Sequence, residues 1–233
     1  EFTKCALALD SLPSDLFGMR VEDTYRFRYL NPLLLNKLPP KSRSDYGRML
    51  RWLGLSGSED DFSLLSKFGL IAGTDGLIFY PEPEIEGGVY HLKFFLHAIR
   101  HMHPDALPWC EKAKEGDRLL PVLDLQNPAD ENAVALRPDK LPLLVGYIPA
   151  FYAADLRTIL ADRNSAKTAM VRVEFNNEDA PVQLRLLCSI TVPVPSGFQT
   201  MQSEEHMPIT GSRDEHRSWP SGKDGGIALF AGA

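Results

Sequence analysis

Two hydrophobic patterns divide the chain. Apolar residues recur at helical spacing in short segments of the first third, and they form strand-like runs after residue 88. In the second part, residues alternate between apolar and polar or form short apolar runs, which predicts strands. The predicted strands cover residues 89–101, 118–125, 132–137, 143–148, 168–175 and 183–192. Two short helices are expected between them, at 105–114 and 150–161. Six short strands with two small helices indicate a barrel or a sandwich, and hence the α+β class.

The first third of the chain predicts a small α/β module. A helix capped by Ser42 or Ser44 should run to about Leu53, because its apolar residues recur at helical spacing. A second helix should begin near Asp60 or Asp61, either of which can cap it with its carboxylate. A short strand is expected at 77–80, after a glycine-containing turn.

A connector rich in proline, glutamate and glycine occupies residues 81–88. Such a segment is stiff and acidic at first and flexible at its end. We therefore predict a first module at 1–87, which includes the connector, a second at 88–193 and a mobile tail at 194–233. The tail loses hydrophobic periodicity and is rich in polar residues, so it could also be an arm that packs on a partner.

The charge is unevenly distributed along the chain, which has a formal net charge of −6. Residues 1–53 hold nine Lys/Arg against six Asp/Glu, a net charge of +3. Residues 54–87 hold one Lys against seven Asp/Glu, and residues 88–193 are nearly neutral. Because non-specific phosphate binding needs a basic face, any nucleic-acid binding in the second module has to rest on a local pocket.

Hydrophobic and cysteine content place the chain among ordinary globular proteins. It is 44% hydrophobic and 24% charged, and no apolar run is long enough to span a membrane. Its cysteines, Cys5, Cys110 and Cys188, are odd in number and lack paired spacing. This pattern argues against a disulfide framework and favours a reducing, cytoplasmic setting.

Two short motifs interrupt the predicted strands. Asn127-Pro128-Ala129-Asp130 breaks one strand before Asn132 begins the next, and Gly146-Tyr147-Ile148-Pro149 leads from a strand into a helix. Asn and Asp side chains bond to nearby backbone, and proline pre-sets one dihedral angle. Taken alone, the first motif is therefore typical of a tight turn between strands.

The order and spacing of these motifs over residues 88–193 resemble the HIRAN domain. That resemblance implies an OB-like barrel with two short helices that grips the 3′ end of single-stranded DNA. Asn127 and Asp130 would approach the terminal sugar, where a carboxylate accepts a hydrogen bond from a free 3′-hydroxyl and repels a phosphate. Arg100 would neutralise a phosphate.

The resemblance also implies roles for two ring-bearing residues. His101 stands where the family often has an aromatic ring, and imidazole can stack on a base. Tyr147 would hydrogen-bond a phosphate or stack. Two positions depart from the family pattern, since Ala129 replaces a stacking aromatic residue and Ala150 replaces a basic one. These departures and the acidic charge favour the alternative of a protein-interaction or regulatory module with a degenerate DNA site.

Three segments of the first module, 38–43, 61–69 and 76–84, resemble the small N-terminal subdomain of HipA-type toxin kinases. The resemblance implies a bacterial-type protein with a fold and a protein-contact surface in this module, but no phosphoryl transfer. The basic residues of the first predicted helix could extend a nucleic-acid track along the strand: Arg43, Arg48 and Arg51.

Catalytic motifs are missing from the sequence. It has no Gly-rich phosphate loop, no kinase catalytic loop and no Ser-His-Asp arrangement, so we predict no catalytic residue and no cofactor. A metal-dependent hydrolase is a further alternative, because His101 and His103 could share an ion with Cys110 as a third ligand. Scattered surface histidines are the default interpretation, so the predicted site contains no metal.

Overall fold

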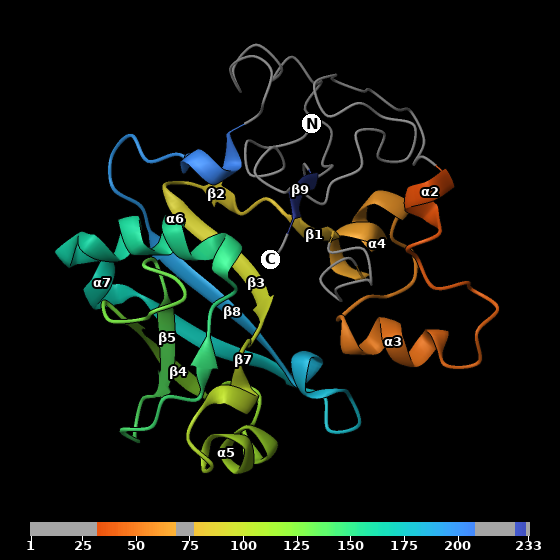
Figure 1. The fold of residues 1–233 in the computed structure, drawn as a ribbon, viewed down its shortest axis with the longest axis horizontal. Coiled ribbons are helices and arrows are strands. Elements are labelled where there is room, and N and C mark those ends of the chain that lie inside the picture. The colour runs from red at the N-terminus through yellow and green to blue at the C-terminus, as the bar shows by residue number, and fades with distance from the viewer. Residues whose placement is uncertain (1–31, 69–76, 208–226, 232–233) are drawn as a thin grey trace. The chain divides into compact units, whose positions relative to one another are not determined.

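The computed structural model describes residues 32–68, 77–207 and 227–231 (Figure 1). The chain divides into two compact units. One unit combines Glu1–Glu82 with Met201–Ala233, and the other is Pro83–Thr200. This division lies close to the predicted boundary after residue 87, but it joins the end of the chain to the first unit.

The first unit contains three short helices and a two-stranded antiparallel sheet. The helices are α2 (Pro32–Leu35), α3 (Tyr46–Trp52) and α4 (Asp61–Phe68), and the strands are β1 (Leu77–Pro81) and β9 (Ile227–Ala231). A 3₁₀ turn, η3, covers Glu204–His206. Helix α3 begins later than predicted, because turns occupy residues 41–45. As predicted, Asp60 caps α4, with its Oδ1 accepting the backbone N–H of Ser63 at 2.8 Å.

The segment predicted as a tail includes a strand at residues 227–231. These residues form β9, which pairs with β1 over the whole of both strands. The pairing runs from Leu77 opposite Ala231 to Pro81 opposite Ile227. An isolated strand such as β1 exposes unpaired backbone groups, and β9 satisfies them.

The second unit is built on a seven-stranded antiparallel sheet in the order β2-β3-β8-β7-β4-β5-β6. Its strands are β2 (Glu84–Glu86), β3 (Val89–Phe95), β4 (Arg118–Leu123), β5 (Val134–Pro138), β6 (Gly146–Tyr147), β7 (Met170–Asn176) and β8 (Leu186–Pro193). Its helices are α5 (Ala106–Lys112), α6 (Ala150–Ala161) and α7 (Arg163–Thr168), with 3₁₀ turns η1 (Ile99–His101) and η2 (Val182–Leu184). Figure 1 shows α6 and α5 at opposite ends of β4 and β5.

A backbone bridge joins the two sides of this sheet into a curled, OB-like barrel. His97, two residues beyond β3, pairs antiparallel with Tyr147 of β6. The N–H of His97 donates to the Tyr147 carbonyl at 2.9 Å, and the N–H of Tyr147 donates to the His97 carbonyl at 3.0 Å. The α+β class with an OB-like barrel is therefore confirmed. The interior is apolar and buried, with Leu119, Leu136 and Ile190 among its members.

Several predicted elements change at their ends. The strand predicted at 89–101 ends at Phe95, because Ala98 adopts a left-handed conformation (φ 60°) before η1. Residues 84–86 of the predicted connector form β2, which turns into β3 at Gly87 and Gly88 with positive φ. Helix α6 has the predicted bounds, and the unpredicted α7 is capped by Asp162. None of the described helices has the length and hydrophobicity that a bilayer crossing requires.

The backbone bridge depends on the absence of a side chain at Gly146. A Cβ atom there would lie 2.6 Å from the His97 carbonyl oxygen and 2.7 Å from Leu96 Cγ. Both contacts are shorter than van der Waals packing allows, so the two segments would have to separate.

We therefore expect Gly146→Ala to lower the free energy of unfolding by about 1–3 kcal/mol, the usual cost of overpacking. Amide hydrogen exchange should show lost protection at His97 and Tyr147. The control is Gly47→Ala in α3, where a Cβ would meet only the flexible end of Arg51 at 3.9 Å. That change should leave stability unaltered or raise it by about 0.5–1 kcal/mol. Unchanged amide protection at His97 and Tyr147 in Gly146→Ala would show that the bridge does not depend on the glycine.

Candidate nucleic-acid interface

The turn between β4 and β5 is held by its own side chains. Asn127 Oδ1 accepts hydrogen bonds from the backbone N–H of Ala129 at 3.0 Å and of Asp130 at 3.1 Å. Asp130 Oδ1 accepts the N–H of Asn132 at 2.8 Å. These side chains take the place of backbone acceptors, which is how Asn and Asp stabilise turns. We call residues 124–133 the corner.

A carboxylate that the sequence analysis missed, Asp124, links the corner to β6. Its Oδ2 atom accepts the Tyr147 hydroxyl at 2.7 Å and the Asn127 side-chain amide at 3.2 Å. The hydrogen bond from Tyr147, followed by that from Asn127, holds the pKa of Asp124 below its usual range. Two predicted site residues from separate segments therefore meet at one charged group.

Tyr147 lies on the outer face of the barrel, where β4, β5 and β6 run side by side. Val122 pairs with Ala135, and Ala135 pairs with Tyr147, so the three side chains share one face of the sheet. Asp124 follows Val122 by two residues and belongs to the same face. On this face Val122 is 37% exposed, whereas Ala135, which lies between Val122 and Tyr147, is fully buried. Burial, and then the hydrogen bond to Asp124, raises the pKa of the Tyr147 hydroxyl.

Helix α6 holds the corner from the other side. The Arg157 guanidinium donates a hydrogen bond to the Glu131 carbonyl. Asp130, one residue earlier, is half-buried. The corner is thus fixed by α6 and by β6 as well as by its own turn.

Arg100 and His101 lie on η1, immediately beyond the bridge between His97 and Tyr147. Both side chains are exposed. Both residues belong to the predicted strand 89–101, but the left-handed Ala98 turns the chain before them. Within the described part of the chain, no hydrogen bond or ion pair joins either side chain to the corner.

Residues 89–195 match the model of the HIRAN domain family. This segment is a HIRAN domain. Among solved structures, the chain is similar to the HIRAN domain of human HLTF, with 16% identity and a TM-score of 0.36, over 48% of this chain and 84% of that chain. It is also similar to a protein from Lactobacillus plantarum, with 15% identity and a TM-score of 0.35, over 46% of this chain and 100% of that chain. The search of curated proteins finds no match.

The HIRAN match confirms the resemblance that the motifs carry, and this family is known for binding DNA. The matched residues begin after β2 and do not include the helices of the first unit. The resemblance of that unit to HipA-type kinases stays a prediction.

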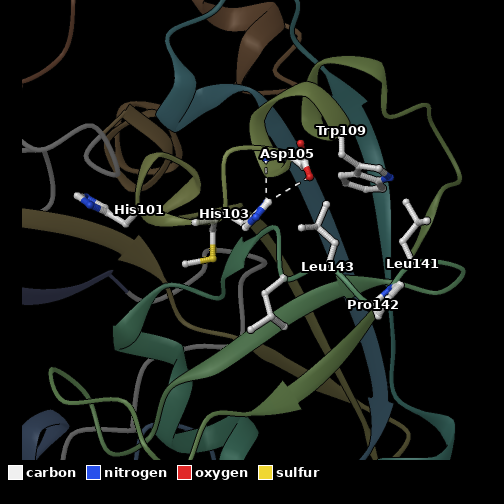
Figure 2. Close-up of a pocket in the computed structure, with 9 residues that line it drawn as sticks. His101, His103, Asp105, Trp109, Leu141, Pro142 and Leu143 are labelled. Carbon is white, nitrogen blue, oxygen red and sulfur yellow. Dashed lines mark hydrogen bonds and ion pairs between the residues drawn. The ribbon is translucent and has the colours of Figure 1, made fainter.

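His101 contributes to a second feature of the HIRAN domain, a groove beyond the bridge. The groove is formed by η1, the segment that follows it, α5 and the loop between β5 and β6 (Figure 2). Its lining residues are His101, Met102, His103, Asp105, Trp109, Leu141, Pro142, Leu143 and Leu144. The predicted site residues therefore divide between two places, with Asn127, Asp130 and Tyr147 at or beside the corner and His101 on the groove.

The predicted basic track lies on and just before α3, in the first unit. Arg43, Arg48 and Arg51 are all exposed, as expected for a solvent-facing basic surface. Asp45 offsets part of their charge, since it lies 2.8 Å from Arg43 and 3.9 Å from Arg48. The guanidinium of Arg48 also stacks over Trp52, 5.3 Å from the ring centre. A role for this surface in nucleic-acid binding stays a prediction.

The predicted alternative of a metal site is not assembled around the histidines. Cys110 is buried with its Sγ directed at the Val145 carbonyl, and burial raises the pKa of its thiol to about 12. A metal needs the thiolate, which such a site disfavours. His103 instead lies 3.3 Å from the Asp105 carboxylate. Over the described residues, no group of three or more His, Cys, Asp or Glu side chains is placed to hold an ion.

Asp124 and Arg157 are the residues that sequence reasoning missed. Asp124 directly follows an apolar strand and precedes the Asn-Pro turn. A charged residue at that position is a usable signal, because polar groups at strand ends beside turns often organise a site. Arg157 gives no such signal, since it lies in the middle of a helix and reaches the corner only through the fold.

We expect Tyr147→Phe to raise the pKa of Asp124 toward its ordinary value, because the change removes the largest cause of the depression. Carboxyl chemical shifts in an NMR titration would measure this pKa. Because folding lowers the pKa of Asp124, its ionised carboxylate stabilises the fold at pH values above the unfolded-state pKa. This stabilisation is lost as the pH falls through the folded-state pKa. The variant should therefore lose less stability on acidification below about pH 4.

Asp162 is the internal control for this titration. Its pKa is lowered chiefly by the backbone N–H of Ser165, at a site separate from Tyr147. It should titrate identically in both proteins. An unchanged Asp124 pKa in the variant would show that the tyrosine hydroxyl is not its controlling partner.

Proposed function

We propose that the HIRAN domain binds single-stranded DNA at its 3′ end, without catalysing a reaction. The observation that carries the proposal is the corner, where Asp130 is fixed by its own turn beside the Tyr147–Asp124–Asn127 network. A site that is already ordered loses little conformational entropy when a ligand binds. The Asp130 carboxylate would accept the terminal 3′-hydroxyl, and Asn127 would lie against the sugar.

The charges around the corner favour a hydroxyl over a phosphate. Asp124, Asp130 and Glu131 are close in sequence on one turn, and Asp124 is held ionised by its hydrogen bonds. An ionised carboxylate accepts a hydrogen bond from a hydroxyl but repels the charge of a phosphate monoester. Phosphates further along the strand would meet Arg100, which is exposed beyond the bridge.

Stacking at this site would rest on Tyr147. Ala129 cannot stack, and it is exposed on the corner. The loss of one aromatic platform costs about 1–3 kcal/mol per base. Tyr147 is half-buried, so one base would stack on the part of the ring that stays exposed. We therefore expect moderate affinity with a shallow salt dependence, because few phosphates are neutralised.

A protein-interaction role is a second candidate, favoured by Leu125 on the same corner. Its side chain is 70% exposed, and Val122, three residues earlier, is 37% exposed. Exposed apolar side chains gathered at one place are typical of contact surfaces. A partner that covers the corner would compete with single-stranded DNA.

The proposal is tested by fluorescence anisotropy at low salt, with short single strands that carry either a free 3′-hydroxyl or a 3′-phosphate. We expect the wild-type protein to prefer the hydroxyl by about tenfold, the value of one charge-assisted hydrogen bond. Asp130→Asn keeps an oxygen for the Asn132 N–H but removes the charge. It should abolish most of this preference, and Asp130→Ala should also weaken binding of the hydroxyl end.

The control is Asp139→Asn, which removes an exposed carboxylate on the opposite end of β5. It should retain the preference of the wild type. Equal binding of both ends by the wild-type protein would refute end recognition. Absence of binding to any single strand would favour the protein-interaction role.

A further inference from the structure

The groove beyond the bridge is an aromatic and apolar depression with a volume of about 710 Å³. Figure 2 shows Trp109, Leu141 and Leu143 together at one end and His101 at the other. Trp109 is half-exposed, and Leu141 is 45% exposed. These side chains present apolar surface to solvent that a ring-shaped ligand would cover.

The position of the groove follows from the direction of the bridge. His97 and Tyr147 pair antiparallel. The residues that follow His97 (98–101) and the residues that precede Tyr147 (144–146) therefore leave the bridge on the same side. These segments lead to His101 and Leu144, which line the groove. Tyr147 thus stands between the groove and the corner, because β5 runs from the corner, past Tyr147, toward the loop that supplies Leu141–Leu144.

The charges in the groove suit a neutral ring on a phosphate backbone. Its one carboxylate, Asp105, is exposed and lies 3.3 Å from His103 Nδ1, while every other lining side chain lacks a negative charge. Arg100, which is exposed, immediately precedes the lining residue His101. A phosphate held by Arg100 would place the base attached to it at the mouth of the groove.

We propose that this groove binds a nucleobase of the same single strand, upstream of the 3′-terminal nucleotide, with Trp109 as the stacking platform. The inference rests on the proposed binding of the 3′ end at the corner. The strand would run from the corner across Tyr147, pass Arg100 with its phosphate, and insert a base among Trp109, Leu141 and Leu144. Stacking on an indole is tolerant of sequence, since every base has a π face.

The elements around the groove favour a base over a peptide. Every lining residue lies in η1, α5 or a loop, and none lies in a strand of the described sheet. An extended peptide therefore has no open strand edge in the groove to which it could add. Continuity with Tyr147 along the strand β6 instead connects the groove to the site proposed for the terminal nucleotide.

The test is a length series of single strands with a free 3′-hydroxyl, from a dinucleotide to a hexanucleotide, measured by competition in fluorescence anisotropy. We expect the wild-type affinity to rise with length until a base reaches the groove. Trp109→Ala should weaken the hexanucleotide about tenfold or more and leave the dinucleotide unchanged. Trp109→Phe should keep most of the wild-type affinity for the hexanucleotide.

Leu141→Glu is a second variant that leaves the barrel interior intact, because this side chain is exposed. It puts a charge where the base would lie and should reproduce the effect of Trp109→Ala. The matched control is Phe175→Ala on β7, an aromatic residue that is 47% exposed and does not line the groove. It should bind every length as the wild type does.

The stacked nucleotide is located by 2-aminopurine placed at successive positions from the 3′ end. Its fluorescence should be quenched most at one upstream position, and Trp109→Ala should remove this quenching. If longer strands bind with 3′-end preference but neither groove variant weakens them, the groove proposal is overturned while the corner proposal stands. If no strand of any length binds, both proposals fail.

Discussion

The bridge between His97 and Tyr147 is the constraint on which the HIRAN domain depends. Its two hydrogen bonds join the short strand β6, which β5 holds through only two paired positions, to the segment after β3. They form only because Gly146 has no side chain to push Leu96 away. The bridge closes the barrel and holds β6, from which Tyr147 reaches Asp124. Arg100 and the groove lie beyond the bridge, on the side away from the corner.

A single carboxylate organises the site on the other side of the bridge. Asp124 receives one hydrogen bond from β6 and one from the corner, so a shift of either segment would leave its charge less well satisfied. The hydrogen bond between them acts on both groups, since it lowers the pKa of Asp124 and adds to burial, the larger cause, in raising that of Tyr147. The phenol therefore stays protonated, and its hydroxyl is directed at the Asp124 carboxylate.

Local sequence patterns predicted many helices, strands and turns of this domain. They could not predict the contacts between segments that are distant in the sequence. The bounds of α6 followed from hydrophobic periodicity, and the Asn127–Asp130 turn followed from side chains that bond to their own backbone. The end of β3 was missed because Phe94, Phe95 and Leu96 form one apolar run across the point where pairing stops. The bond between Tyr147 and Asp124 spans 23 residues, and no spacing rule predicts it.

The acidic charge of the chain becomes compatible with DNA binding when it is considered by position. A protein that holds duplex backbone needs a basic surface, because its affinity comes from neutralised phosphates. Recognition of a chain end can instead draw on one hydroxyl, one or two stacked bases and a single cation such as Arg100. In the proposed arrangement the carboxylates of the corner would contribute to selectivity, since a negative charge disfavours a phosphate at the place of the terminal hydroxyl. Affinity would then be limited by stacking area, so the proposal makes the surfaces beside Tyr147 and Trp109, rather than net charge, the expected determinants of binding strength.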